Sequence, residues 1–75
     1  MTDKEWKKLC EWVREKNLKE LMVTPLLIGD CIELYIRETN TTITFYKNGM
    51  ISVEGRVIKN NLKQAQIKAI IENLL

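Results

Sequence analysis

The chain contains no histidine, one proline, three glycines and two cysteines among its 75 residues. Without histidine, it lacks the commonest general base and the commonest metal ligand of proteins. Two cysteines are too few for the disulfide framework of a small secreted domain. Cys10 and Cys31 also form no CxxC pair of the kind that binds zinc. We therefore expect reduced, buried thiols and neither a metal nor a cofactor.

Other routes to catalysis are equally poor. Ser52 is the single serine of the chain, and no histidine is present to activate it. Asp30 and Glu33 lie three residues apart in an extended segment, which aims them at opposite faces of a strand. The three glycines are scattered and make no phosphate-binding loop. We expect no catalytic residues and a protein that is not an enzyme.

Long apolar runs and a large excess of one charge are also missing. No segment approaches the roughly 20 apolar residues that span a bilayer, and the start MTDKEWKK lacks the apolar region of a secretory signal. Twelve Lys and Arg against ten Asp and Glu give a net charge of +2, whereas dedicated nucleic-acid binders show a clustered basic excess. We expect a cytoplasmic protein with no membrane association.

The residues that are present predict one α+β domain covering 1–75. Hydrophobic residues make up 45% and charged residues 29% of the chain, as in soluble globular proteins. Thr2 and Glu5 fit a capping box that opens a helix over 3–21. Pro25 ends that region because it forces the preceding residue out of helical geometry. The apolar stripe of this helix is Trp6, Leu9, Cys10, Val13 and Leu21.

Alternating apolar and polar residues predict three strands in the middle of the chain, over 32–37, 41–46 and 50–57. In the third strand the inward positions are Ile51, Val53, Gly55 and Val57. The segment 26–28 is left open between a loop packed into the core and a short extra strand.

The strand register follows from the period of two. A three-residue loop over 47–49 pairs Phe45 with Ile51, whereas a two-residue turn would mix the two faces of the sheet. We therefore predict that the glycine closing this loop is left-handed and forms a bulge. The same reasoning pairs Ile36 with Ile43 across a tight loop.

A second helix is predicted from a cap at Asn61 to Asn73, with Gln64 completing the capping box. Its broad apolar stripe consists of Ile67, Ile70, Ile71 and Leu74, and a smaller second face consists of Leu62, Ala65 and Ala69. Two apolar faces imply two partners, which are the sheet and either the first helix or another subunit. The predicted order is α-β-β-β-α, with a three-stranded antiparallel sheet and both helices packed on one face.

Two surfaces are candidates for binding a partner. On the first helix, Trp12 lies about 120° from Trp6, among charged residues that include Lys8 and Lys16. It is either a residue covering the rim of the core or an anchor for a partner, since tryptophan is frequent at interface hot spots.

The second candidate surface is the outer face of the sheet. Its predicted contact residues are Tyr35, Arg37, Tyr46 and Met50. We predict that Tyr35, Thr44 and Ser52 form one cross-strand row and that Glu33, Tyr46 and Met50 form another. The alternatives are ordinary cross-strand pairing on a solvated sheet and a platform for a partner.

The α-β-β-β-α order and the chain length resemble those of the double-stranded RNA-binding domain. In that family a basic start of the last helix contacts phosphates across the major groove. The segment IKNNLKQAQIK offers Lys59, Lys63 and Lys68 at the corresponding place. RETNTT stands where the family has a Gly-Pro-x-His stretch, and the lysine cluster is reduced to single residues. The resemblance implies duplex RNA or DNA binding as an alternative function.

Small phage and mobile-element proteins that block host defences are similar in style, being tiny and free of catalytic residues, although no motif is shared. We therefore expect a non-enzymatic binding or regulatory protein that contacts another protein and blocks a host factor. A homodimer through a sheet edge or through the Leu62, Ala65 and Ala69 face is a further expectation.

Overall fold

The computed structural model describes residues 1–16, 18 and 23–74 of the chain, so the predicted place of Leu21 in the helical stripe lies outside the described residues. The elements, in order, are α1 (Asp3–Glu15), β1 (Val23–Ile28), β2 (Cys31–Ile36), β3 (Thr41–Tyr46), β4 (Ile51–Val53), β5 (Arg56–Lys59) and α2 (Gln64–Leu74). The α+β class is confirmed. The prediction of three strands is wrong, because the sheet has five.

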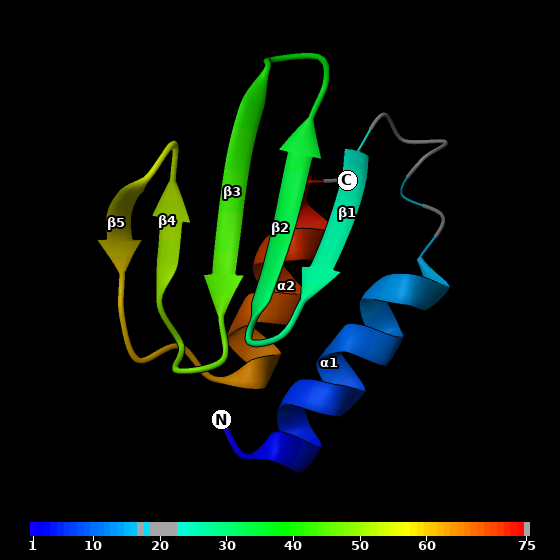
Figure 1. Cartoon of the computed structure of the whole chain (residues 1–75), viewed down its shortest axis with the longest axis vertical. Coiled ribbons are helices and arrows are strands. Elements are labelled where there is room, and N and C mark those ends of the chain that lie inside the picture. Colours follow the sequence, from blue (N-terminus) through cyan, green and yellow to red (C-terminus); the bar gives the residue numbers. More distant parts are fainter. Residues whose placement is uncertain (17, 19–22, 75) are drawn as a thin grey trace.

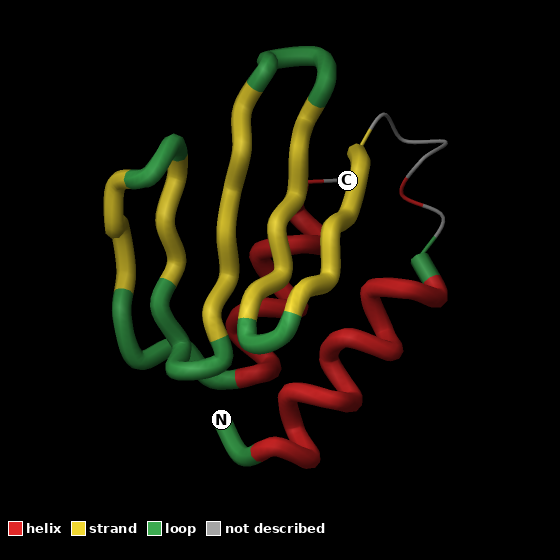
Figure 2. Tube along the Cα trace, viewed as in Figure 1, coloured by secondary structure: helices red, strands yellow, loops and turns green. Residues whose placement is uncertain are grey.

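The five strands form one antiparallel meander in the order β1-β2-β3-β4-β5 (Figure 1). Figure 2 shows the strands as a single layer, with α2 behind its middle strands and α1 alongside β1. The Cα radius of gyration is 11.4 Å, close to the roughly 11 Å expected for a compact domain of this length.

The first additional strand is β1. The segment 26–28, left open by the sequence, belongs to this strand, which pairs along its whole length with β2. It contains Pro25, whose missing N–H group is tolerated because β1 is an edge strand with one unpaired side.

The second additional strand arises because the predicted strand 50–57 is a hairpin. Glu54 and Gly55 have positive φ values of 51° and 78°, as a two-residue type I′ turn requires. The chain therefore reverses after Val53 and returns as β5. Val57, predicted to point inward, is instead 48% exposed.

The predicted register between β3 and β4 is confirmed, because Phe45 pairs with Ile51 across the loop 47–49. Gly49 in that loop has a φ of +90°. The predicted pairing of Ile36 with Ile43 is wrong, since Leu34 pairs with Ile43 and a four-residue turn replaces the tight loop. The two-residue shift leaves every side chain on its predicted face.

The capping box of α1 is confirmed, since both reciprocal hydrogen bonds between Thr2 and Glu5 are present. The helix is shorter than predicted and ends at Glu15, because Lys16 adopts an extended conformation with ψ 135°.

The start of α2 is also displaced from its predicted position. The helix begins at Gln64 instead of following a cap at Asn61, and the Lys63 N–H donates to Gln66 Oε1 at 2.8 Å. Leu62 lies before the helix and packs against the core. The predicted Leu62, Ala65 and Ala69 face is therefore wrong for Leu62, while Ala65 and Ala69 are exposed on α2.

One apolar cluster joins both helices to the inward side of the sheet, so the helices cover the same face. Leu9, Val13, Phe45, Ile67 and Ile71 are fully buried in it. Leu18, which the predicted stripe omits, is also buried there, at 1% exposure. In the part of the chain that the structure describes, both helices lie on this side of the sheet, and the opposite side carries none (Figure 1).

Candidate interaction surfaces

The structure separates the predicted contact residues into two sets on opposite sides of the sheet. Lys8 and Trp12 lie on α1, and Lys16 is the C-cap that follows it. Tyr35, Tyr46 and Met50 lie on or beside the strands that form the open face. Arg37 lies in the turn that follows β2 and is exposed. A single flat partner therefore does not reach all of these residues at once.

Trp12 lies at the seam between α1 and α2. Its ring is half-buried and packs against the core. The Lys16 ammonium lies 4.7 Å and the Lys68 ammonium 5.5 Å from the ring centroid, both within the range of cation–π attraction. Lys16 also lies 3.9 Å from Glu72 on α2. These contacts favour the rim-covering alternative for Trp12, and its contact with a partner stays a prediction.

The open face of the sheet is organised by a row of paired residues that crosses all five strands. The row consists of Leu26, Glu33, Thr44, Ser52 and Val57. Its ends are apolar and half-exposed, with Leu26 at 49% and Val57 at 48%. Ser52 within the row is only 4% exposed, so its neighbours cover the hydroxyl-bearing side chain.

The predicted rows on this face are wrong in register. Tyr35 pairs with Thr42 instead of Thr44, and Tyr46 pairs with Cys31 instead of Glu33. The two tyrosines therefore lie at opposite ends of the face, separated by about 13 Å along the strand direction. The Tyr35 hydroxyl donates to Asn40 Oδ1 in the turn after β2. Tyr46 and Met50 are linked by a main-chain hydrogen bond of 2.9 Å and are half-buried.

The three lysines of the nucleic-acid alternative do not converge. Lys59 ends β5 and Lys63 precedes α2, and both are exposed. Lys68 is half-buried, and its ammonium lies against the Trp12 ring. The five-stranded sheet also departs from the three-stranded topology on which the resemblance to the double-stranded RNA-binding domain depends.

The cysteines are unpaired and half-buried, with Cys10 on α1 and Cys31 at the start of β2. Burial raises the pKa of the Cys10 thiol, which favours the uncharged, less nucleophilic form. Among the described residues, no group of three or more His, Cys, Asp or Glu is placed to hold a metal ion.

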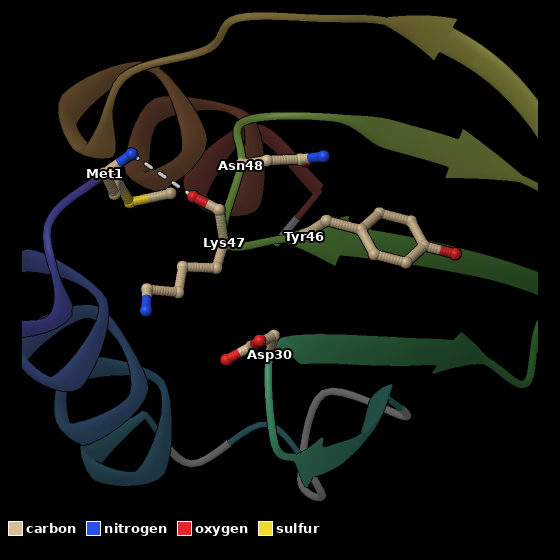
Figure 3. Close-up of a pocket in the computed structure, with 5 residues that line it drawn as sticks. All are labelled: Met1, Asp30, Tyr46, Lys47 and Asn48. Atoms are coloured by element: carbon tan, nitrogen blue, oxygen red, sulfur yellow. Dashed lines mark hydrogen bonds between the residues drawn. The ribbon is translucent and has the colours of Figure 1, made fainter.

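A concave region of about 310 Å³ lies where the N-terminus meets the loops at one end of the sheet, lined by Met1, Asp30, Tyr46, Lys47 and Asn48 (Figure 3). The Met1 amino group donates to the Lys47 carbonyl at 3.2 Å, and the Lys47 N–H donates to the Asp30 carbonyl at 3.0 Å. The Lys47 ammonium pairs with Asp3. These contacts of Lys47 join the N-terminus and the start of α1 to the end of the sheet.

Sequence reasoning missed the free edge strand β5. All four residues of β5 are exposed, including the apolar Val57 at 48% and Ile58 at 55%. The signal was the Glu54-Gly55 pair, which supplies a hairpin turn inside a run of alternating residues.

No protein-family model, no curated protein and no solved structure matches this chain. Within the described residues, neither helix is long and apolar enough to cross a membrane.

Proposed function

We propose that this protein is a small non-enzymatic binding or regulatory protein that acts by protein–protein contact through the open face of its sheet. The observation that carries the proposal is the row across all five strands, which begins at Leu26 and ends at Val57, both half-exposed. Tyr35 and the pair of Tyr46 and Met50 lie on either side of this row.

The physical basis is the removal of apolar surface from water. Each square ångström of apolar surface covered by a partner contributes about 25 cal/mol, and tyrosines add area at little cost in side-chain entropy. The helices already cover the other face through the buried cluster, so the uncovered face is the one that offers this gain. The partner would be a host factor that the protein blocks by occupying its surface.

A substitution at the centre of the row tests the proposal. Thr44→Arg places a long, charged side chain in the middle of the open face, where burial without a partner charge opposes binding. Ala69→Arg is the matched control, because it adds the same side chain at an exposed position of α2. When the immobilised full chain is exposed to a bacterial extract, wild type and Ala69→Arg should capture the same partner protein. The Thr44→Arg variant should fail to capture that protein.

Equal capture by a folded Thr44→Arg variant would refute the role of the open face. A Trp12→Ala variant measured in the same assay settles the second predicted surface. If it stays folded and keeps full capture, Trp12 belongs to the core rim.

Nucleic-acid binding through Lys59, Lys63 and Lys68 stays a prediction. A mobility shift with duplex RNA at low salt tests it, because binding by these lysines would weaken steeply as salt rises. The homodimer also stays a prediction, for which sedimentation over a concentration series is the direct measurement.

A further inference from the structure

The two outer edges of the sheet are unlike each other. At one edge, β1 contains Pro25, which has no N–H to donate, and α1 contacts this strand. At the other edge, β5 contains no proline, and all four of its residues are exposed. The free edge of β5 is therefore the one that can pair with a further strand.

The hairpin geometry fixes which main-chain groups of β5 point outward. Val53 and Arg56 close the two-residue turn, and in such hairpins the closing residues exchange both hydrogen bonds. The next pair, Ser52 and Val57, is then the non-bonded pair of the ladder, so the N–H and C=O of Val57 point away from β4. A register shift follows, which leaves Ile58 as an extra, bulged residue.

Charge decides what kind of strand fits this edge. Arg56 and Lys59 flank Val57 and Ile58, and within the described part of the chain neither cation forms an ion pair. The adjacent Glu54 carboxylate is bound to the Thr42 N–H at 2.6 Å. A second copy of β5 would bring two more cations to the same edge, where like charges repel. An acidic strand would instead pair with both.

We propose that β5 accepts an extended segment of a partner protein as a sixth strand, in which acidic side chains alternate with apolar ones. The main chain of Val57 supplies hydrogen bonds, as in other cases of strand addition. Arg56 and Lys59 attract the acidic side chains, and the apolar ones cover Val57 and Ile58. This inference rests on the proposed function, since it names the chemistry of the partner, and it extends the row of the open face by one strand.

The probe is a synthetic peptide of eight residues in which Glu alternates with Val, compared with the analogue in which Lys replaces Glu. Titrated into the isotope-labelled full chain at low salt, the acidic peptide should shift the amide resonances of Arg56 to Lys59 and of β4. It should bind about tenfold more tightly than the basic analogue, from two surface ion pairs. The double variant Arg56→Glu and Lys59→Glu should reverse that preference.

A proline at the outward-pointing donor provides a second variant. Val57→Pro removes an N–H that the ladder does not use, a change that edge strands tolerate, whereas Val57→Ala keeps the N–H and trims the side chain. We expect Val57→Pro to lower the affinity for the acidic peptide by about tenfold relative to Val57→Ala, because one main-chain hydrogen bond is lost. If Val57→Pro does not fold, the charge-reversed double variant decides.

Three results would overturn the inference. They are equal affinity for the acidic and basic peptides, amide shifts confined to the open face away from β5, and shifts in β5 that follow the concentration of the protein itself, which would indicate a second copy. If the cellular partner is captured equally by wild type and Val57→Pro, the inference fails while the proposed function stands. If the peptide binds β5 but no cellular protein is captured, the proposed function fails instead.

Discussion

The two tryptophans of α1 occupy different environments. Trp6 is 6% exposed, and its indole N–H donates to the Gly29 carbonyl at 3.1 Å. Trp12 is half-buried beneath the ammonium groups of Lys16 and Lys68. The first ties the helix to the turn between β1 and β2, and the second closes the seam with α2.

Alanine substitutions at these two positions should separate the roles. We expect Trp6→Ala to lower the free energy of unfolding by about 3–5 kcal/mol, as for buried aromatic residues. Trp12→Ala should lower it by about 1–2 kcal/mol, because part of this side chain already meets solvent and the cation–π contacts are modest. Urea unfolding followed by circular dichroism measures both. Equal losses would contradict the assignment of Trp12 to the rim.

Of the three glycines, only Gly49 leaves no room for an added side chain. Its φ is +90°, and an added Cβ would lie 2.6 Å from the Leu62 carbonyl oxygen and 2.7 Å from the Leu62 nitrogen. These are main-chain atoms held in place, since the Leu62 N–H donates to the Gly49 carbonyl at 2.9 Å. The loop after β3 and the segment before α2 therefore approach each other at a position that requires glycine.

Gly29 provides the matched comparison for this site. It also has a positive φ, of +53°, but an added Cβ would meet nothing within 4 Å. We expect Gly29→Ala to lower the free energy of unfolding by about 1–2 kcal/mol, because alanine is strained in the left-handed conformation. Gly49→Ala should lower it by about 2–4 kcal/mol, because steric overlap with Leu62 adds to the backbone strain. Similar urea midpoints for the two variants would show that Leu62 moves away freely.

At the scale of elements, the N-terminus of α1 depends on an ionised side chain. The main-chain N–H of Thr2, and then its side chain, lower the pKa of the Glu5 carboxyl below its ordinary value by hydrogen bonding. A carboxyl whose pKa is lowered in the folded state stabilises that state at pH values above the pKa of the unfolded chain, which is about 4.3 for Glu. The contribution is lost as the pH falls through the lowered folded value.

The Glu5→Gln variant should therefore show a flatter stability profile. Glutamine keeps an acceptor for the Thr2 N–H but does not titrate, so we expect less loss of stability than in wild type between about pH 5 and pH 3. Thr2→Ala is the control, because it removes the hydroxyl that accepts from the Glu5 N–H at 3.1 Å at any pH. It should cost about 1 kcal/mol throughout. Parallel profiles for wild type and Glu5→Gln would contradict this view.

Local patterns predict the elements that are set by nearest neighbours. The alternation over 41–46 identifies the inward positions, and the loop length between Phe45 and Ile51 fixes their register, because a slip of one residue would turn every side chain over. The capping box of α1 is equally local and equally well predicted.

Strands β1 and β5 were not predicted from the sequence because local patterns at these places point to a different structure. Gly55 continues the alternation of inward positions at Ile51 and Val53, so the turn at this point looks like a continuation of the strand. Glu54 also lacks the turn preference of Asn or Asp. Pro25 argues against a strand anywhere except at a sheet edge, and which strand becomes the edge depends on the whole topology. For the same reason, the exposure of Val57 and Ile58 is not readable from their sequence.

At the scale of the whole molecule, stability is concentrated in one cluster. Buried residues of α1, α2, β2, β3 and β4 belong to it. A single cluster predicts cooperative unfolding, so the transitions followed by tryptophan fluorescence and by circular dichroism should coincide. Two separate midpoints would show that part of the sheet unfolds without the helices.

The edge strand β5 is the exception to this cooperativity. None of its four residues is buried, and it pairs with β4 alone through a ladder interrupted by a bulge. Amides in such a segment exchange through local opening, whereas amides in a buried strand exchange only on global unfolding. Native-state hydrogen exchange should therefore give the β5 amides a lower free energy of opening than the amides of Ile32 and Leu34 in β2. An acidic peptide added at a concentration that just saturates the wild-type protein should raise the β5 values, and the same concentration should raise them less in a Val57→Pro variant. Equal protection of β5 and β2 in the free protein would mean that β5 is already covered, and that its edge is not available to a partner.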